Sequence, residues 1–273
     1  MTIPSQIGSG VGFRSLRIYE IDPDTGLPNA SGSEPYTGVW VSGVRNLEIT
    51  DPDARIFTHI GDDGPFAQQS LPPTESMSGR LTTAKRNLTL DAILSGQEVF
   101  EMGQAQAIGS GTDKRGFERQ VAALAYRQMV DTDPDSETYG RTRWEFKVMP
   151  LVQFLPLEGG FAQDSVDERA YNLRPAFVTR NITGKDFNNT DEGFQRAQVI
   201  SGIAANKPFF DFFLGNGSQT VFVFDSDFDT SDVESIAVWV DGVLTAATET
   251  LTQVTLSPAP ASGAFVAIKR EIL

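Results

Sequence analysis

The sequence predicts a mainly β protein with one helix. Short segments in which apolar and polar residues alternate recur along the chain, and this is the pattern of half-buried strands. The 25 glycines and 15 prolines interrupt these segments often, and one segment alone has helical spacing. With 273 residues, 40% of them hydrophobic, the chain can bury the core of one large β-rich domain or of two unequal domains.

The first part of the chain predicts strands in succession. Residues 13–21 alternate imperfectly, and residues 36–50 read as one long strand with a wetter face. Further strands are expected at 75–84, 119–130, 141–155 and 171–180. The turn-rich residues 131–140 predict a hairpin between two of them, and the polar residues 181–207 read as a connector.

The one helix is expected at residues 85–95. Leu88, Ala92 and Ile93 share a face there, and Gly96 supplies a C-terminal stop. Asp91, in the middle of this helix, is expected to be solvated. Prolines and glycines exclude a central strand at 61–73, and we expect projecting loops near 22–35, 61–73 and 103–116.

The chain changes character near residue 207, where we place a boundary between domains 1–207 and 208–273. Eight of the nineteen phenylalanines follow it. Asp241-Gly242 predicts a two-residue hairpin turn, because both residues can adopt positive φ. Strands are expected at 219–224, 235–240, 243–248, 251–256 and 264–270.

Composition argues against several function classes. Without cysteine the chain cannot form disulfides or thiolate sites, and His59 is its single histidine. The net charge of −14, half of it in residues 208–273, disfavours a protein that reads nucleic-acid sequence. No Gly-x-Ser-x-Gly motif is present, so we expect neither an enzyme nor a cofactor. A hydrolase that uses scattered carboxylates stays open as an alternative.

Two runs of alternating aspartates invite comparison with calcium loops. Counted from Asp131 or from Asp225, the sixth and twelfth positions lack the Gly and Glu that an EF-hand requires. We therefore assign no metal site, although irregular calcium binding stays open beside solvated turns. The residues concerned are Asp131, Asp133, Asp135, Asp225, Asp227 and Asp229.

Several segments, taken in order, resemble the major tail (tail tube) proteins of long-tailed bacteriophages over about residues 13–180. They are Val44-Arg-Asn-Leu-Glu-Ile-Thr, His59-Ile-Gly-Asp-Asp-Gly, Leu71-Pro-Pro, Asn87-Leu-Thr-Leu-Asp-Ala-Ile-Leu-Ser-Gly, Trp144-Glu-Phe-Lys-Val-Met-Pro and Pro156-Leu-Glu-Gly-Gly-Phe. The resemblance implies a tail-tube-type β-sandwich with a flanking helix. It also implies homo-oligomeric, hexameric rings that stack head-to-tail around a channel for DNA ejection.

The same resemblance implies a place and partners. The location would be the virion tail, with synthesis in the host cytoplasm, and we see neither a signal peptide nor a membrane-spanning apolar run. Tape-measure, tail-terminator and distal-tail proteins would be partners, and genomic DNA would pass without sequence-specific binding. Loops in such a tube would be mobile in the monomer and ordered in the assembly.

Two sets of residues are candidates for such an assembly. The wetter strand faces nominate residues that line the lumen: Asn46, Glu48, Ser78, Arg80, Thr82, Glu145 and Lys147. The loops nominate residues that contact the next ring: Asp62, Asp63, Pro65, Phe66, Asp113 and Lys114. A one-residue error in register would exchange the faces of a strand.

The C-terminal part separately resembles small β-modules, sandwich-like and appended to phage tail and fibre proteins. The segments that carry this resemblance are Gly215-Asn-Gly-Ser-Gln-Thr-Val-Phe-Val-Phe, Val238-Trp-Val-Asp-Gly-Val-Leu and Ser257-Pro-Ala-Pro-Ala-Ser-Gly-Ala-Phe-Val-Ala-Ile. The resemblance implies an outward-facing decoration. A host-surface or glycan-binding tail module is therefore the alternative function.

Overall fold

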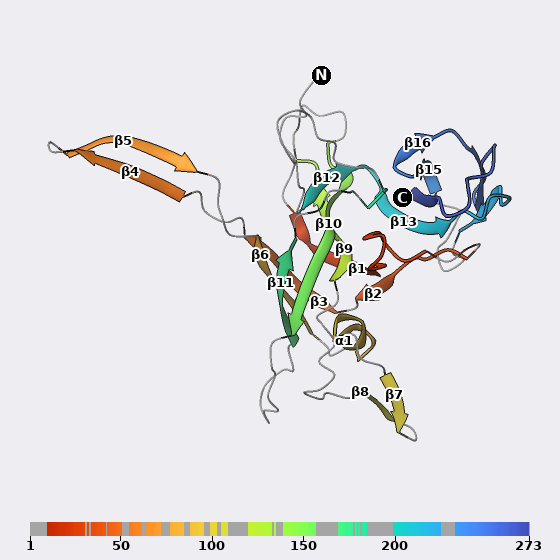
Figure 1. The fold of residues 1–273 in the computed structure, drawn as a ribbon, viewed down its shortest axis with the longest axis horizontal. Coiled ribbons are helices and arrows are strands. Elements are labelled where there is room, and N and C mark those ends of the chain that lie inside the picture. The colour runs from red at the N-terminus through yellow and green to blue at the C-terminus, as the bar shows by residue number, and fades with distance from the viewer. Residues whose placement is uncertain are drawn as a thin grey trace.

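Antiparallel strands make up most of the chain in the computed structural model, which is mainly β with one short helix (Figure 1). The structure describes residues 10–30, 32, 34–41, 43–50, 55–61, 64–71, 77–84, 88–95, 99–102, 105–108, 120–132, 134, 139–156, 169–176, 178, 180, 182–184, 199–224 and 233–272. No helix among these residues is long and apolar enough to cross a membrane.

The largest sheet has eight strands and curls, and we call it the curled sheet. Its order is β2 (Val39–Val41), β1 (Gly10–Glu20), β9 (Gln120–Val130), β10 (Thr142–Pro156), β11 (Arg169–Pro175), β6 (Ser78–Thr83) and β3 (Val44–Thr50). β12 (Ile200–Ala204) pairs with the first half of β10.

One bent segment brings the two ends of this sheet together. β2 and β3 lie at opposite ends of the strand order, yet two residues alone separate them in the chain. The bend is at Gly43, where φ is +72°, and the carbonyl of Gly43 accepts a hydrogen bond from the Ala84 amide. The expectation of one strand over 36–50 is therefore wrong, because its two halves pair with different partners.

The inner side of the curled sheet forms the first core. Leu16, Ala123 and Phe154 are fully buried there, and Leu90 and Leu94 of α1 (Leu88–Ser95) pack against them. Shared burial of one helix face is what stabilises so short a helix. The helix confirms the sequence prediction over the residues described.

The C-terminal unit consists of two further sheets. The first, with four strands, has the order β13 (Lys207–Leu214), β19 (Phe265–Ile272), β15 (Val233–Val240) and β16 (Val243–Thr245). The second, with three strands, has the order β14 (Val221–Val223), β18 (Gln253–Thr255) and β17 (Thr248–Glu249). Phe213, Phe222 and Val266 belong to the core between these two sheets.

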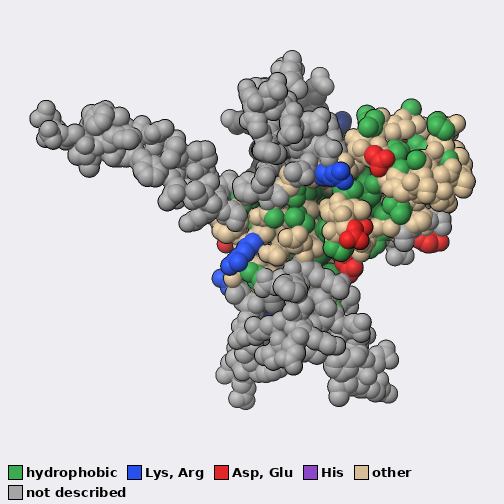
Figure 2. Space-filling model, in the orientation of Figure 1, with side chains coloured by type: hydrophobic (Ala, Val, Ile, Leu, Met, Phe, Trp, Pro, Cys, Tyr) green, Lys and Arg blue, Asp and Glu red, His purple; other side chains and the backbone are tan. Residues whose placement is uncertain are grey.

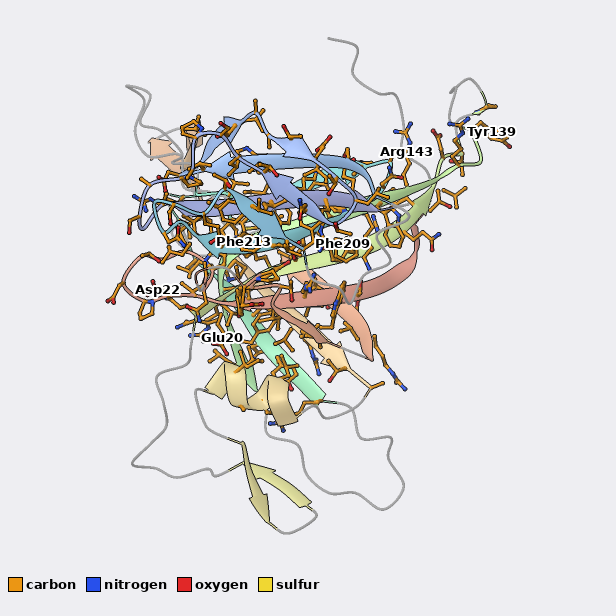
Figure 3. All side chains as sticks on the ribbon, turned by 90° about the vertical axis from the view of Figure 1, so that its right-hand side faces the viewer. Glu20, Asp22, Tyr139, Arg143, Phe209 and Phe213 are labelled. Carbon is orange, nitrogen blue, oxygen red and sulfur yellow. The ribbon has the colours of Figure 1, made fainter. Side chains whose placement is uncertain are left out.

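The four-stranded sheet is covered on its other face by the curled sheet. Tyr19, Leu124 and Tyr126 of the curled sheet form one cluster with Phe212 and Ala267 of the C-terminal unit. The cross-section therefore has three β layers, with the four-stranded sheet in the middle. In Figure 3, Phe209 and Phe213 of β13 are labelled in the middle of the molecule, among the stacked strands.

β13 was not expected from the sequence. Because both of its faces are covered, its residues read Lys-Pro-Phe-Phe-Asp-Phe-Phe-Leu without alternation. A backbone bridge between Tyr36 and Phe212, of 2.9 and 3.1 Å, ties it to an earlier segment. The boundary at 207 coincides with the start of β13, but the two parts share a core.

Two separate hairpins extend from this assembly in Figure 1. β4 (Arg55–Gly61) pairs with β5 (Gly64–Leu71), and β7 (Val99–Met102) pairs with β8 (Ala105–Ile108). The loop expected at 61–73 is thus wrong for the residues of β5. The register of this hairpin shifts between His59, the partner of Ala67, and Ile60, the partner of Pro65.

Local turn chemistry is confirmed at Asp241 and Gly242. Their φ angles are +48° and +79°, and they connect β15 to β16 with Val240 opposite Val243. The Asp241 carboxylate also accepts a hydrogen bond from the Phe265 amide at 2.8 Å. The hairpin expected at 131–140 is confirmed by the pairing of β9 with β10.

Candidate functional site: the open face and the seam

Five of the seven lumen candidates share one surface, which we call the open face. Asn46 lies opposite Thr82, Glu48 opposite Arg80, and Ser78 opposite Thr50, so all point away from the inner core. Asn172 and Arg174 of β11 continue this face and are exposed. The C-terminal unit does not cover β3, β6 or β11: none of their described residues belongs to the cluster that the curled sheet shares with that unit.

The charge of the open face differs from that of the chain. Glu48 accepts a hydrogen bond from the Asn46 amide at 2.6 Å and has Arg80 directly across. Arg80 and Arg174 supply two positive charges against one negative charge from Glu48. The net negative charge of the chain is therefore not reproduced on this described surface.

Glu145 and Lys147 lie on the opposite side of the curled sheet. Lys147 is the partner of Ala125, which belongs to the inner core, and Glu145 is the partner of Arg127. Glu145 and Arg127 form an ion pair. The seven lumen candidates are thus divided between two faces, and which face lines a channel stays a prediction.

The inter-ring candidates are mostly beyond the described part of the chain. Asp62, Asp63, Asp113 and Lys114 lie outside the described residues. Pro65 and Phe66 lie on β5, for which the backbone is described.

Of the aspartates in the two runs, the structure describes Asp131. It is buried, with 6% of its surface exposed, and its carboxylate lies 3.7 Å from the Arg143 guanidinium. Figure 3 shows Arg143 and Tyr139 toward the end of the β9–β10 hairpin. The other five aspartates lie outside the described residues. Within the described part, no group of three or more His, Asp or Glu residues could hold a metal ion.

Asp91 is buried rather than solvated, which corrects the sequence expectation. Tyr171 donates a hydrogen bond of 2.6 Å to its carboxylate, and the Arg169 Nε lies 3.9 Å away. Burial, followed by the bond to Asp91, raises the pKa of Tyr171 above its ordinary value. These contacts attach α1 to the first residues of β11.

An ion pair is enclosed in the C-terminal unit. Arg270 and Asp211 are both 0% exposed, with 2.6 Å between a guanidinium nitrogen and a carboxylate oxygen. The Arg270 guanidinium also lies 4.7 Å from the ring centre of Phe224. Loss of either charge would leave the other buried without its partner, so removal of one side chain should destabilise the C-terminal unit.

A group of aromatic and basic side chains joins the two parts of the molecule, and we call it the seam. It consists of Arg17, Trp40, Tyr126, Trp144, Lys207 and Phe209. Sequence reasoning missed it. The available signal was Arg17 on the same strand face as Tyr19 and Ile21, since a cation on an otherwise apolar face indicates a buried site.

Tyr126 makes the most direct contact across the seam. Its hydroxyl donates a hydrogen bond of 2.5 Å to the Pro208 carbonyl, and its ring centre lies 4.8 Å from the Lys207 ammonium. Burial raises the pKa of Tyr126 well above its ordinary value. The phenol thus stays a neutral donor.

Neither a comparison with protein-family models nor a comparison with curated proteins gave a match.

Proposed function

We propose that the chain is a structural virion protein that assembles with copies of itself, as stacked rings, into the tail tube of a long-tailed bacteriophage. The observation that carries the proposal is the division of the curled sheet's outer surface. One part is sealed by the C-terminal unit, and the other is the polar open face of three adjacent strands. A repeated subunit needs such distinct surfaces for one heterologous contact.

Strand edges give further support. Among the described residues, β3 pairs with β6 alone and β12 pairs with β10 alone. An edge strand presents amide and carbonyl groups that can pair with a strand of another copy. β12 also exposes 40% of Ile203, an apolar side chain on a short edge.

Assembly of the purified protein tests this function. We expect rings or tubes in electron micrographs at high protein concentration, and faster sedimentation as concentration rises. Monomers that persist at high concentration, even with a tail initiator complex, would contradict the proposal.

A matched pair of variants locates the assembly surface. Asn172→Glu adds one charge at the centre of the open face, opposite Arg80, where the monomer tolerates it. Thr248→Glu adds the same charge on exposed β17 of the C-terminal unit. We expect the first variant to weaken assembly and the second to leave it unchanged, and equal effects would exclude the open face as the contact.

Exposed apolar side chains favour a second function, the binding of a host surface or glycan by the C-terminal unit. Val243 and Leu244 are 67% and 68% exposed beside the β15–β16 turn, and Val223 is 51% exposed. Figure 2 shows hydrophobic side chains spread over this unit. The Val243→Ser, Leu244→Ser double variant should lose binding to host cells but not assembly, and unchanged binding would contradict this function.

A further inference from the structure

The seam contains a cation surrounded by rings from both parts of the molecule. The Lys207 ammonium lies 4.7 Å from the ring centre of Trp40, 4.8 Å from Tyr126, 5.4 Å from Trp144 and 5.1 Å from Phe209. Three of these rings belong to the curled sheet, whereas Lys207 and Phe209 begin β13. This cage therefore exists while the two parts are docked and is lost when they separate.

A second cation shares two of these rings. The Arg17 guanidinium lies 4.8 Å from the ring centre of Trp40 and 5.9 Å from that of Phe209, and Arg17 is 1% exposed. Ring faces attract each cation, but burial and mutual repulsion oppose the charge on Lys207. Burial and then Arg17 lower the pKa of Lys207 from 10.5 to about 8.

Other ionisable groups face this place from the neighbouring strands. β1 contributes Arg17 and Tyr19, and β9 contributes Tyr126. Burial raises the pKa of both tyrosines, so neither ionises there. Asp211 of β13 is paired with an arginine of β19, and β2 and β10 contribute indole rings on this face.

We propose that Lys207 is a proton-controlled latch, which holds the C-terminal unit on the curled sheet most firmly when its amine is neutral. Opening of the seam returns this side chain to water, where it keeps its proton to higher pH. Between pH 8 and about pH 10, opening therefore takes up a proton, and rising pH disfavours it by up to about tenfold per pH unit. Below pH 8 both forms are protonated, and the opening equilibrium does not depend on Lys207.

Hydrogen exchange of the β13 amides measures this opening directly. After correction for the intrinsic exchange rate, we expect the protection of β13 in the full-length protein to rise by up to about tenfold per unit between pH 8 and pH 10. Lys207→Met keeps the length of the side chain without the amine and should remove this slope. Lys269→Met is the control, because Lys269 lies on neighbouring β19 and pairs with Glu271, and it should retain the slope.

Two outcomes would contradict the proposal that the protonation of Lys207 controls the opening of the seam. The first is a wild-type slope that Lys207→Met leaves unchanged. The second needs no variant and holds even if Lys207→Met fails to fold: nuclear magnetic resonance of the labelled lysine side chains would find a Lys207 midpoint at the ordinary value, not near pH 8. The inference does not depend on self-assembly, so its failure leaves the proposed function untouched.

Discussion

The hydroxyl of Tyr126 donates a hydrogen bond to the carbonyl of Pro208, a residue 82 positions later in the chain. This bond crosses from the curled sheet to the first residues of the C-terminal unit. The bond lies beside the rings that surround Lys207. The start of β13 is therefore attached to the curled sheet by both a hydrogen bond and aromatic contacts. The bond therefore contributes to the contact between the C-terminal unit and the curled sheet.

Removal of this hydroxyl should weaken the protein measurably. Tyr126→Phe leaves a buried carbonyl without its donor, so we expect the free energy of unfolding in urea to fall by about 1–3 kcal/mol. Tyr139→Phe, at a side chain that is 61% exposed, is the matched control and should have no effect. Equal stabilities of the two variants would show that the bond contributes nothing.

Truncation after residue 206 should not give a well-behaved core. The deletion would expose Tyr19, Leu124 and Tyr126, which are at most 1% exposed in the intact chain. Exposed apolar area of this kind drives aggregation. We expect the truncated chain to bind a hydrophobic dye and to unfold at a lower temperature, whereas a soluble monomer with an unchanged transition would refute the shared core.

The buried ion pair should show strong coupling in a double-mutant cycle. Asp211→Asn and Arg270→Met should each lower the free energy of unfolding by about 3–5 kcal/mol, because each leaves a buried charge without its partner. The double variant should lose much less than the sum of the two. Additive losses in chemical denaturation would contradict a direct interaction.

Stability should fall at alkaline pH because of the buried tyrosines. Burial raises the pKa of Tyr36 to about 12 and also raises those of Tyr19, Tyr126 and Tyr171. The unfolded chain loses these protons near pH 10, whereas the folded chain retains them. The contribution of these tyrosines to stability is therefore complete below pH 10 and declines above it.

Denaturant titrations between pH 9 and pH 12 would measure this decline, and ultraviolet absorbance would follow the ionisation of the phenols. Tyr171→Phe should reduce the slope, since one of the shifted groups is removed. A stability that stays constant over this range would contradict the burial of these hydroxyls.

Local patterns predicted local structure well. The Asp241-Gly242 turn and the face shared by Asn46 and Glu48 follow from residue chemistry and from the two-residue period of a strand. Contacts between distant segments limited the rest. β13 carries no alternation because both of its faces are covered. Position 202 in β12 requires glycine because a side-chain methyl group there would collide with the ring of Phe146. That ring is more than fifty positions away, so residues 181–207 read as a connector.

The candidate site shows the same limit. The alternation of β3 and β6 predicted five residues on one face, and the observed pairing agrees. Glu145 and Lys147 fall on the other face because β10 changes partners along its length and contains an irregularity between Met149 and Val152. The seam joins residues from β1, β2, β9, β10 and β13, and no pattern within one segment predicts that they come together.

The bend at Gly43 has a mechanical consequence. Because β2 and β3 are consecutive in the chain but lie at opposite ends of the strand order, the sheet cannot flatten without separating one of them from its partner. A load that bends the sheet is therefore shared among its strand pairs as shear on many hydrogen bonds. A sheet built in this way resists changes in its curvature.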